Sequence, residues 1–306
     1  MKSILLNAYG EAPYLADVAM PEPGATDVLV RVAAASLNPL DNKLQAGYLD
    51  GVFPLTFPSK MGTDLAGVVE KTGSLMSRWR AGDRVVARLL PTEGGAFAEF
   101  TLVPEDQLVL IPESIDFDQA AGMPTAAATA WQALFETAGL TAGQTVLIHA
   151  GAGGVGSFAI QFAHAAGARV VATASGDGME IARRLGAEQV IDYRSEDFAS
   201  VVSDVDVVLD TIGGETQQKS FGILRRGGKL MTVVSPPDEA LAKAHGVEAA
   251  FIFHSSDAKR LSAVMKEVVS KRLSVLIDRS VSLESFDEAF ARQASGRAHG
   301  KIVVCV

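Results

Sequence analysis

The stretch from Thr145 to Ser175, TVLIHAGAGGVGSFAIQFAHAAGARVVATAS, constrains the fold of this chain most strongly. An apolar run (145–149) leads into a glycine-rich turn, a segment of helical periodicity and a second apolar run (169–174). That order is typical of a βαβ unit. Between the first strand and the helix, three glycines have the spacing G-x-G-x-x-G. The sequence therefore contains a candidate phosphate-binding turn, and a purely structural glycine turn is the alternative.

The three glycines, Gly151, Gly153 and Gly156, have separate expected roles. In such a motif one glycine allows a tight turn, one lets the backbone approach a pyrophosphate, and one lets the helix pack closely on the strand. The following helix offers free N–H groups to the phosphates. Because the flanking strands and helix fall where the motif requires them, we expect residues 151 and 153–156, including Gly154 and Val155, to bind a dinucleotide.

Composition restricts the class of protein. The 306 residues are 48% hydrophobic and 21% charged, which is typical of a soluble protein with room for two domains. A net charge of −9 argues against nucleic acid or an anionic membrane as the main partner. The single cysteine, Cys305, excludes an intrachain disulfide and any zinc cluster of several cysteines. The first residues lack the pattern of a signal peptide, so we expect a cytoplasmic protein.

The hydrophobic pattern changes along the chain. Residues 1–113 form short apolar runs separated by Pro, Gly and Asp, which indicates a β-rich domain. Residues 117–138 are largely helical with a break near Pro124. Strands and helices then alternate as in a doubly wound α/β domain; we expect strands at 189–192, 205–210, 229–234 and 249–253, and helices at 177–185 and 215–224.

The last fifty residues have mixed signals. A helix is expected at 256–271, a strand at 276–281, a short helix at 283–292 and a final strand at 300–304. A strand that follows a Rossmann-type domain in this way is expected to return to the β-rich domain. The expected domains are therefore 1–118, which is catalytic, and 119–256, which binds nucleotide, with 257–306 returning to the first.

Several motifs together resemble the zinc-independent quinone oxidoreductase and enone reductase branch of the medium-chain dehydrogenase/reductase superfamily. They are SLNPLDNKLQAG (36–47), MGTDLAGVV (61–69), GDRVVA (82–87), GGAFAEF (94–100), AAGMPTAAATAWQAL (120–134), the glycine turn, DTIGG (210–214) and GRAHGKIVV (296–304). The resemblance implies a Rossmann-type doubly wound parallel sheet, a second GroES-like β-rich domain, and an active site in the cleft between them. It also implies a homodimer formed through the last nucleotide-domain strand, here Ala249 to Phe253.

Zinc is excluded from the first domain by its ligand types. No cysteine precedes Cys305 and no histidine precedes His149, so the usual nitrogen and sulfur ligands are missing there.

The choice of nicotinamide cofactor is expected to depend on the end of the second Rossmann strand. An NAD-binding site usually has an acidic residue there, whereas this chain has Ser175, whose hydroxyl can donate to a 2′-phosphate. NADPH is therefore the expected cofactor, although Asp177 lies close in sequence. The resemblance adds Tyr193 as a phosphate ligand; the family's lysine is replaced near Met179, and Arg194 is expected to substitute for it.

The resemblance places the catalytic residues in the NPLDNK loop. Lys43 matches a lysine that enone-reducing members carry, and its ammonium would polarise the substrate carbonyl or bind the cofactor ribose. The alternative for Lys43 is a solvated surface lysine. Asp41 either orients Lys43 or caps a turn, and Asn38 either donates its amide to a carbonyl or closes the loop before Pro39.

Further cofactor contacts are expected at the carboxyl ends of the parallel strands. Val234 and Ser235 follow such a strand, and the predicted set also includes Phe253. The resemblance adds Thr125 and Ile212, the latter in the DTIGG turn, as positions beside the nicotinamide. His149 is expected to pack beside the glycine turn. For His254, which follows Phe253, a contact with the cofactor is the less favoured alternative.

The expected function is hydride transfer from NADPH to a quinone or an α,β-unsaturated carbonyl, without zinc or flavin. One alternative is one-electron reduction of quinones with the same cofactor. Another is a non-catalytic NADPH-binding protein that serves as a sensor or a structural protein.

Overall fold

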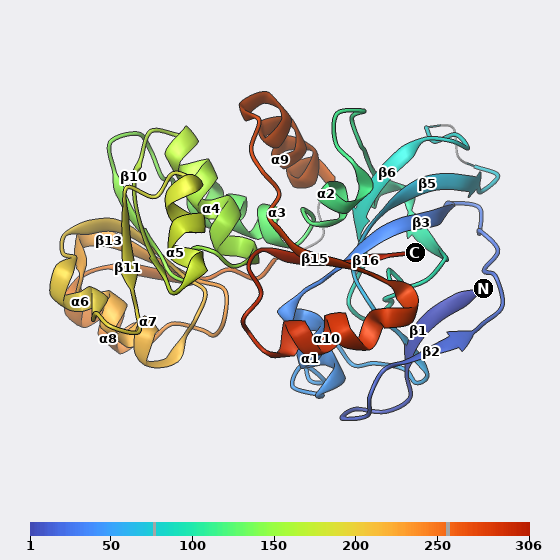
Figure 1. Cartoon of the computed structure of the whole chain (residues 1–306), viewed down its shortest axis with the longest axis horizontal. Helices are drawn as coiled ribbons and strands as arrows, with labels where there is room; N and C mark the ends of the chain where they lie inside the picture. Colours follow the sequence, from blue (N-terminus) through green and yellow to red (C-terminus); the bar gives the residue numbers. More distant parts are fainter. Residues whose placement is uncertain (76–77, 255–257) are drawn as a thin grey trace. The chain divides into compact units, whose positions relative to one another are not determined.

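The computed structural model describes residues 1–75, 78–254 and 258–306, which form two compact units (Figure 1). The first unit contains Met1–Thr125 and Ser256–Val306, and the second contains Ala126–Ser255. The sequence places the first boundary at 118/119, whereas the structure places it after Thr125. The reason is that helix α2 (Phe117–Ala121) packs on strands of the first unit, and Thr125 is hydrogen-bonded to Asp64 there.

The first unit is built on a seven-stranded sheet. Its strands run in the order β15-β16-β3-β5-β6-β8, with β7 paired to β3, and a smaller sheet has the order β2-β1-β4. The strands are β1 (Lys2–Leu6), β2 (Tyr14–Asp17), β3 (Asp27–Leu37), β4 (Ser59–Lys60), β5 (Asp64–Thr72), β6 (Arg84–Arg88), β7 (Phe100–Pro104), β8 (Val109–Leu110), β15 (Ile277–Ser282) and β16 (Lys301–Cys305). The long strand β3 joins both ends of the chain, because it pairs antiparallel with β5, β7 and the C-terminal strand β16.

The first unit also contains α-helices and 3₁₀ turns. They are α1 (Pro39–Gln45), α2, α9 (Ala258–Lys271) and α10 (Phe286–Ala294), with single 3₁₀ turns at Glu105–Gln107 and Leu283–Ser285. The fully buried rings of Phe97 and Phe286 lie 4.9 Å apart between the β-strands and α10, so the C-terminal segment shares the core of the N-terminal strands.

The second unit is a parallel six-stranded sheet with helices on both faces. Its strands are β9 (Thr145–Ile148), β10 (Arg169–Ala174), β11 (Gln189–Asp192), β12 (Val205–Asp210), β13 (Leu224–Thr232) and β14 (Glu248–Phe251). Their order, β11-β10-β9-β12-β13-β14, reverses direction beside β9, the strand before the glycine turn. This is the strand order of a Rossmann fold, so the predicted doubly wound fold is confirmed.

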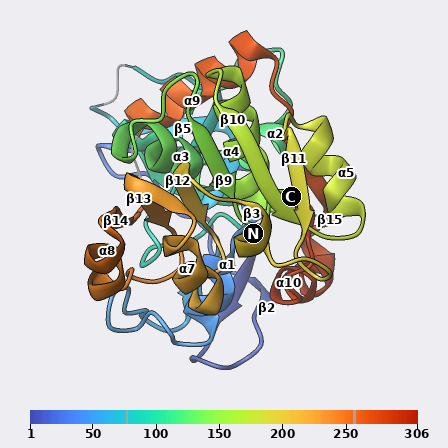
Figure 2. The same cartoon turned by 90° about the vertical axis from the view of Figure 1, so that its left-hand side faces the viewer.

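The helices of the second unit are divided between the faces of the sheet. Helices α4 (Gly154–Ala165) and α5 (Asp177–Arg184) meet Ala172 on one face, and α6 (Phe198–Val201), α7 (Gly214–Phe221) and α8 (Glu239–His245) share a core with Leu147 and Val208 on the other (Figure 2). The preceding segment forms α3 (Ala126–Trp131) and a π-helical stretch, Gln132–Thr137. Successive side chains of a strand point to opposite faces of the sheet, so neighbouring residues of one strand meet different helices.

Candidate active site and cofactor site

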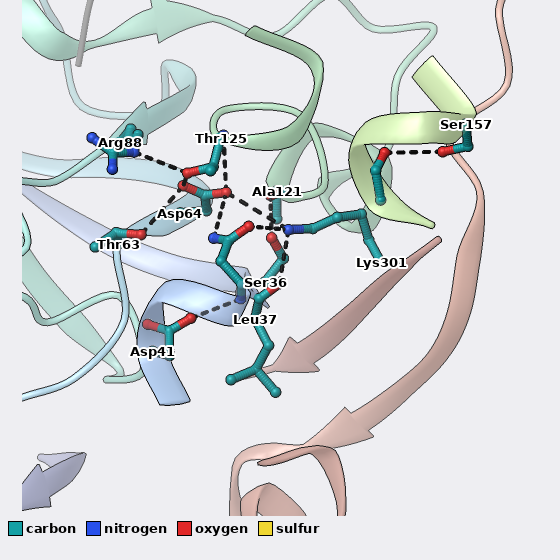
Figure 3. A network of polar contacts seen from close by, with 12 residues as sticks. Ser36, Leu37, Asp41, Thr63, Asp64, Arg88, Ala121, Thr125, Ser157 and Lys301 are labelled. Atoms are coloured by element: carbon teal, nitrogen blue, oxygen red, sulfur yellow. Dashed lines mark hydrogen bonds and ion pairs between the residues drawn. The ribbon is translucent and has the colours of Figure 1, made fainter. Parts of the chain in front are cut away.

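A buried polar network occupies the first unit where β3 ends and β5 begins (Figure 3). At its centre Asp64 is fully buried, yet its carboxylate is well supplied with donors. Thr125 donates its backbone N–H to Asp64 Oδ2 (3.0 Å) and its hydroxyl to Oδ1 (2.6 Å). Asn38 Nδ2 donates to Oδ2 at 3.0 Å. A buried carboxylate needs such partners, and this one joins three separate segments of the chain.

Two buried cations balance the carboxylates of this network. Lys301 Nζ lies 3.9 Å from Asp64 Oδ2 and donates to Leu37 O and Asn38 Oδ1. Arg88 Nε donates to the hydroxyl of Thr125 at 2.9 Å. Burial lowers the pKa of both Lys301 and Arg88, while the nearby carboxylates raise them. The C-terminal strand is thus fixed to the segment that precedes α1.

Helix α1 begins inside this network. Asp41 Oδ2 accepts the backbone N–H of Asn38 at 2.7 Å, and Pro39 occupies the first turn, where its missing N–H costs nothing. From the sequence we expect residues 38–43 to form a loop, but the structure shows that a capped helix begins at Pro39. The side chain of Asn38 bonds Asp64 and Lys301, so its amide oxygen and one amide hydrogen are already used within the protein.

Asp41 has an unusual environment. Its side chain is buried and Oδ1 has no hydrogen-bond partner among the described residues. Burial raises the pKa of Asp41 to about 7, and the negative charge of Asp64 adds to this, whereas the bond from Asn38 N and the two cations oppose it. Asp41 therefore takes up a proton near neutral pH more readily than an ordinary carboxyl group.

Lys43 lies in the last turn of α1, and its side chain is half-buried. Within the described residues, no hydrogen bond or ion pair joins its ammonium to Asp41. Asp41 is therefore placed as a helix-capping residue, and the Lys43 ammonium has no hydrogen-bond or ion-pair partner in the part of the chain that the structure describes.

The glycine turn of the second unit is shaped by close contacts. A Cβ on Gly151 would lie 2.8 Å from Ile160 Cδ1 and 2.9 Å from Ala172 Cβ, so this glycine lets α4 and β10 pack together. A Cβ on Gly156 would lie only 2.2 Å from Ala150 O. At Gly153 the same atom would meet only Ala150 O, at 3.2 Å, so the N-cap of α4 is open. An open cap with free N–H groups is suited to a phosphate.

The residue before Gly151 carries backbone strain. Ala150 has φ +49°, a left-handed conformation that costs about 1–2 kcal/mol for a residue with a Cβ. The turn holds it with a bond from Gly153 N to Ala150 O at 2.9 Å.

The predicted phosphate-binding hydroxyls lie together at the ends of β10 and β11. Ser175 Oγ donates to Tyr193 Oη at 3.0 Å, and Tyr193 is 56% exposed. Arg194 is also exposed beside them in sequence, and its backbone N–H is bound by Asp192. The hydroxyl of Tyr193 and the guanidinium of Arg194 are therefore available to an anionic ligand, and Ser175 can donate to it in place of Tyr193.

The Asp210–Gly214 turn is held from below by a buried carboxylate. Asp210 Oδ1 accepts the N–H groups of Ile212 (2.9 Å) and Gly213 (2.8 Å), and Gln217 Nε2 donates to Oδ2 at 3.0 Å. Gln217 also donates to Ser235 O. The turn and the end of β13 form one connected rim at the carboxyl edge of the sheet, where Ile212 is 51% exposed.

His149 is buried beneath this rim. Its ring nitrogens lie 3.2 Å from Thr173 Oγ1 and 2.9 Å from Ser220 Oγ. Burial lowers the pKa of His149 to about 4, although the charge of Asp210 opposes this, so the ring is neutral at physiological pH.

These features fit a dinucleotide. The open cap at Gly153 and Gly154 would hold the pyrophosphate, and Ser175 with Tyr193 and Arg194 would hold the adenosine end. Ile212, Val234 and Ser235 line the carboxyl edge of the sheet, and Phe253 follows the edge strand β14 with 52% of its surface exposed. Thr125 differs from these residues, because it belongs to the network of the first unit.

Comparisons with known proteins agree with this architecture. Residues 24–113 match the alcohol dehydrogenase GroES-like domain family, and residues 185–304 match the zinc-binding dehydrogenase family. The quinone-oxidoreductase homolog of Spinacia oleracea is 31% identical over 99% of this chain and 98% of its own. The chain belongs to the zinc-independent quinone oxidoreductase branch of the medium-chain dehydrogenase/reductase superfamily. Both the predicted family and the GroES-like domain are thereby confirmed.

Two other similar proteins have names that state a nicotinamide cofactor. The NADPH-dependent alkenal/one oxidoreductase of Arabidopsis thaliana is 40% identical over 78% of this chain and 64% of its own. The Escherichia coli quinone oxidoreductase complexed with NADPH is 25% identical, with a TM-score of 0.91 over the whole of both chains. Members of this branch bind a nicotinamide cofactor, and this protein is an oxidoreductase of the branch.

Two further findings concern absent features. Among the described residues, no cluster of three or more His, Cys, Asp or Glu side chains could hold a metal ion. No helix in the described part of the chain is long and apolar enough to cross a membrane.

Sequence reasoning missed three members of the buried network: Asp64, Arg88 and Lys301. Each carries a charge beside a run of apolar strand residues, in DLAGVV, RVVAR and KIVVCV. A charged residue at the end of a buried strand needs a partner, and that signal marks all three.

Proposed function

We propose that this protein is an NADPH-dependent reductase that transfers hydride to a quinone or an α,β-unsaturated carbonyl, without zinc or flavin. The observation that carries the proposal is the pair of hydroxyls at Ser175, which follows β10, and at Tyr193, which follows the neighbouring strand β11. A carboxylate there would repel a 2′-phosphate, whereas two hydroxyls can donate to it. The names of the Arabidopsis and E. coli relatives support the same cofactor.

The zinc-free part of the proposal rests on ligand chemistry. The first unit has only His299 and Cys305 as nitrogen and sulfur ligand types, and both lie in its C-terminal segment. Because we propose no zinc ion, the negative charge that develops on the substrate is assigned to side chains for stabilisation. Lys301 is already used as the buried counterion of Asp64 in the network.

The residues divide the work as follows. A nicotinamide cofactor held at the glycine turn would supply hydride to the electron-poor carbon of the substrate. Lys43 donates a hydrogen bond to the substrate carbonyl oxygen and stabilises the negative charge that develops there. Asp64, Lys301 and Asn38 fix the start of α1, and so fix the helix that carries Lys43.

The proposal is tested by a screen of enones, alkenals and quinones with oxidation of NADPH as the readout. We expect an acceptor whose turnover gives a saturated ketone or a hydroquinone, and a higher kcat/KM with NADPH than with NADH. A semiquinone signal under anaerobic conditions would instead support one-electron chemistry. Binding of NADPH with no turnover of any acceptor would support a sensor.

The role of Lys43 has a separate test. Lys43→Met should lower kcat with the best acceptor by about 10²-fold, the range found when one donor to a developing oxyanion is removed. Lys271→Met, at the exposed end of α9, is the control and should leave kcat unchanged. Unchanged kcat in Lys43→Met would make Lys43 a surface lysine.

We also propose a homodimer that pairs through the edge strand β14, whose Phe251 is 38% exposed. An apolar edge strand is a natural template for pairing. Light scattering at micromolar concentration should give twice the mass of one chain, and Phe251→Lys should give the mass of one chain. A cytoplasmic location remains a prediction of the sequence.

A further inference from the structure

A chain of hydrogen bonds runs through the second unit from helix α7 to the glycine turn. It begins at Ser220 on α7, passes through the imidazole of His149 at the end of β9, and reaches Thr173 on β10. Thr173 Oγ1 in turn lies 3.2 Å from the backbone nitrogen of Ala150. Ser220 and Thr173 lie on α7 and β10, whereas His149 and Ala150 are consecutive in the turn after β9; all four are buried except Ala150.

The donor and the acceptor of each hydrogen bond in this series follow from the hydrogen atoms of Ser220 and of Ala150 N–H. Ser220 donates its only hydroxyl hydrogen to Thr216 O at 2.7 Å, so Ser220 Oγ must accept from His149. The proton of the neutral ring is therefore on Nε2, and Nδ1 accepts from the hydroxyl of Thr173. Thr173 Oγ1 is then free to accept the N–H of Ala150. The burial that lowers the pKa of His149 favours the neutral ring that this arrangement requires.

Thr173 holds the glycine turn at two consecutive residues. Its side chain accepts from Ala150 N, and its carbonyl accepts from Gly151 N at 2.8 Å. Ala150 is the residue with the left-handed backbone, and its carbonyl receives the N–H of Gly153. The orientation of the open N-cap of α4 therefore depends on the rotamer of Thr173, which His149 fixes.

We propose that His149 is a positioning residue of the cofactor site, which acts through Thr173 to hold the glycine turn in the conformation that receives the pyrophosphate. The inference rests on the dinucleotide site of the proposed function, but not on the acceptor or on the preference for NADPH. The competing explanation is that His149 only fills space, since its ring also packs edge-on against Phe198 at 4.7 Å.

Two substitutions of His149 separate its two hydrogen bonds. In His149→Asn the amide oxygen takes the position of Nδ1 and can still accept from Thr173. In His149→Gln the longer side chain reaches the position of Nε2 and can still donate to Ser220, but the bond to Thr173 is lost. Thr173→Val removes the acceptor for Ala150 N with little change in volume, and Thr173→Ser retains it.

The ligands are chosen to report the pyrophosphate separately. Calorimetry would measure Kd for ADP-ribose, which contains the pyrophosphate, and for adenosine 2′-phosphate, which does not. We expect His149→Gln and Thr173→Val to weaken ADP-ribose about tenfold, the effect of one buried donor left without a partner. His149→Asn and Thr173→Ser should stay within about threefold of the wild type. Adenosine 2′-phosphate should bind all four variants as it binds the wild-type protein.

Three results would overturn the inference. The first is equal ADP-ribose affinity in His149→Gln and His149→Asn, and the second is equal weakening of both ligands in Thr173→Val. The third is ADP-ribose that binds Thr173→Val as tightly as Thr173→Ser. Failure of the proposed function would look different. If no acceptor oxidises NADPH, these affinities stay as predicted; if NADH is preferred, adenosine 2′-phosphate binds the wild-type protein as weakly as the variants, while the predicted differences in ADP-ribose affinity remain.

Discussion

Replacing Lys301 by methionine tests whether the buried network stabilises the first unit. Methionine fills similar space but removes the charge 3.9 Å from Asp64 and the donor to Leu37 O and Asn38 Oδ1. Removing one partner of a buried pair leaves the other charge uncompensated, which costs about 3–5 kcal/mol. We therefore expect Lys301→Met to lower the free energy of unfolding of the first unit by about that amount.

The assay must report on one unit, because a protein with two units need not unfold in a single step. Trp79 is buried in the first unit and Trp131 lies in the second, so fluorescence in a Trp131→Phe background follows the first unit alone during urea unfolding. The control is Lys2→Met, which breaks an exposed pair with Glu284 and should cost less than about 1 kcal/mol. Equal losses in Lys301→Met and Lys2→Met would refute the reasoning.

A double mutant sharpens the same test. Adding Asp64→Asn to Lys301→Met removes the uncompensated carboxylate, so the double mutant should lose at least about 1 kcal/mol less than the sum of the single mutants. Strict additivity would mean that the two side chains are not coupled.

Three further substitutions have defined outcomes. The pKa of Asp41 is raised from 3.8 to about 7 in the folded protein. The contribution of Asp41 to the free energy of unfolding is therefore fully present below pH 3.8 and is lost as the pH rises through 7. Asp41→Asn should therefore gain stability over the wild type between pH 5 and pH 8, by up to about 4 kcal/mol, and a pH-independent difference in urea unfolding would contradict this. Ser175→Asp should lower the ratio of kcat/KM for NADPH to that for NADH at least about tenfold, since a carboxylate repels the 2′-phosphate; an unchanged ratio would remove Ser175 from the phosphate site. Gly156→Ala, whose Cβ would lie 2.2 Å from Ala150 O, should weaken NADPH binding at least about tenfold by calorimetry, whereas Gly51→Ala, with open space around it, should not; equal affinities would mean that the turn can rearrange.

The Rossmann unit could be predicted well because its signals are local. The strands at 169–174, 189–192 and 205–210 coincide with β10, β11 and β12, since each is a short apolar run bounded by turn residues. β13 was expected to begin at 229 but begins at Leu224. The glycine pair at 227–228 resembles a turn, whereas the strand passes through it with a shift in register against β12.

Helices shorter than two full turns were harder to predict. α1 was expected to be a loop because its apolar positions are few, and its capping by Asp41 and Pro39 is the signal that marks it. α8 was not predicted either, although Asp238 accepts from Ala240 N and Leu241 N at its start and Gly246 ends it. Caps rather than periodicity determine such helices.

Part of the candidate site could be predicted from sequence motifs, and part of it could not. The glycine turn and the hydroxyls of Ser175 and Tyr193 could be found from motifs, because their spacing along the chain is short. The buried network joins residues up to 264 positions apart, as in the bond from Lys301 to Leu37 O, and no local pattern places those residues together. Only the charges at the ends of apolar strands indicated that partners were needed.

The central claim is that the Rossmann unit of this chain delivers NADPH for two-electron reduction of a conjugated carbonyl or a quinone. Its most direct test is turnover of NADPH labelled with deuterium at the transferable position, with mass spectrometry of the product. We predict one deuterium on the β-carbon of a saturated ketone when an enone is the acceptor, and faster turnover with NADPH than with NADH. An unlabelled product, or a preference for NADH, would contradict the account.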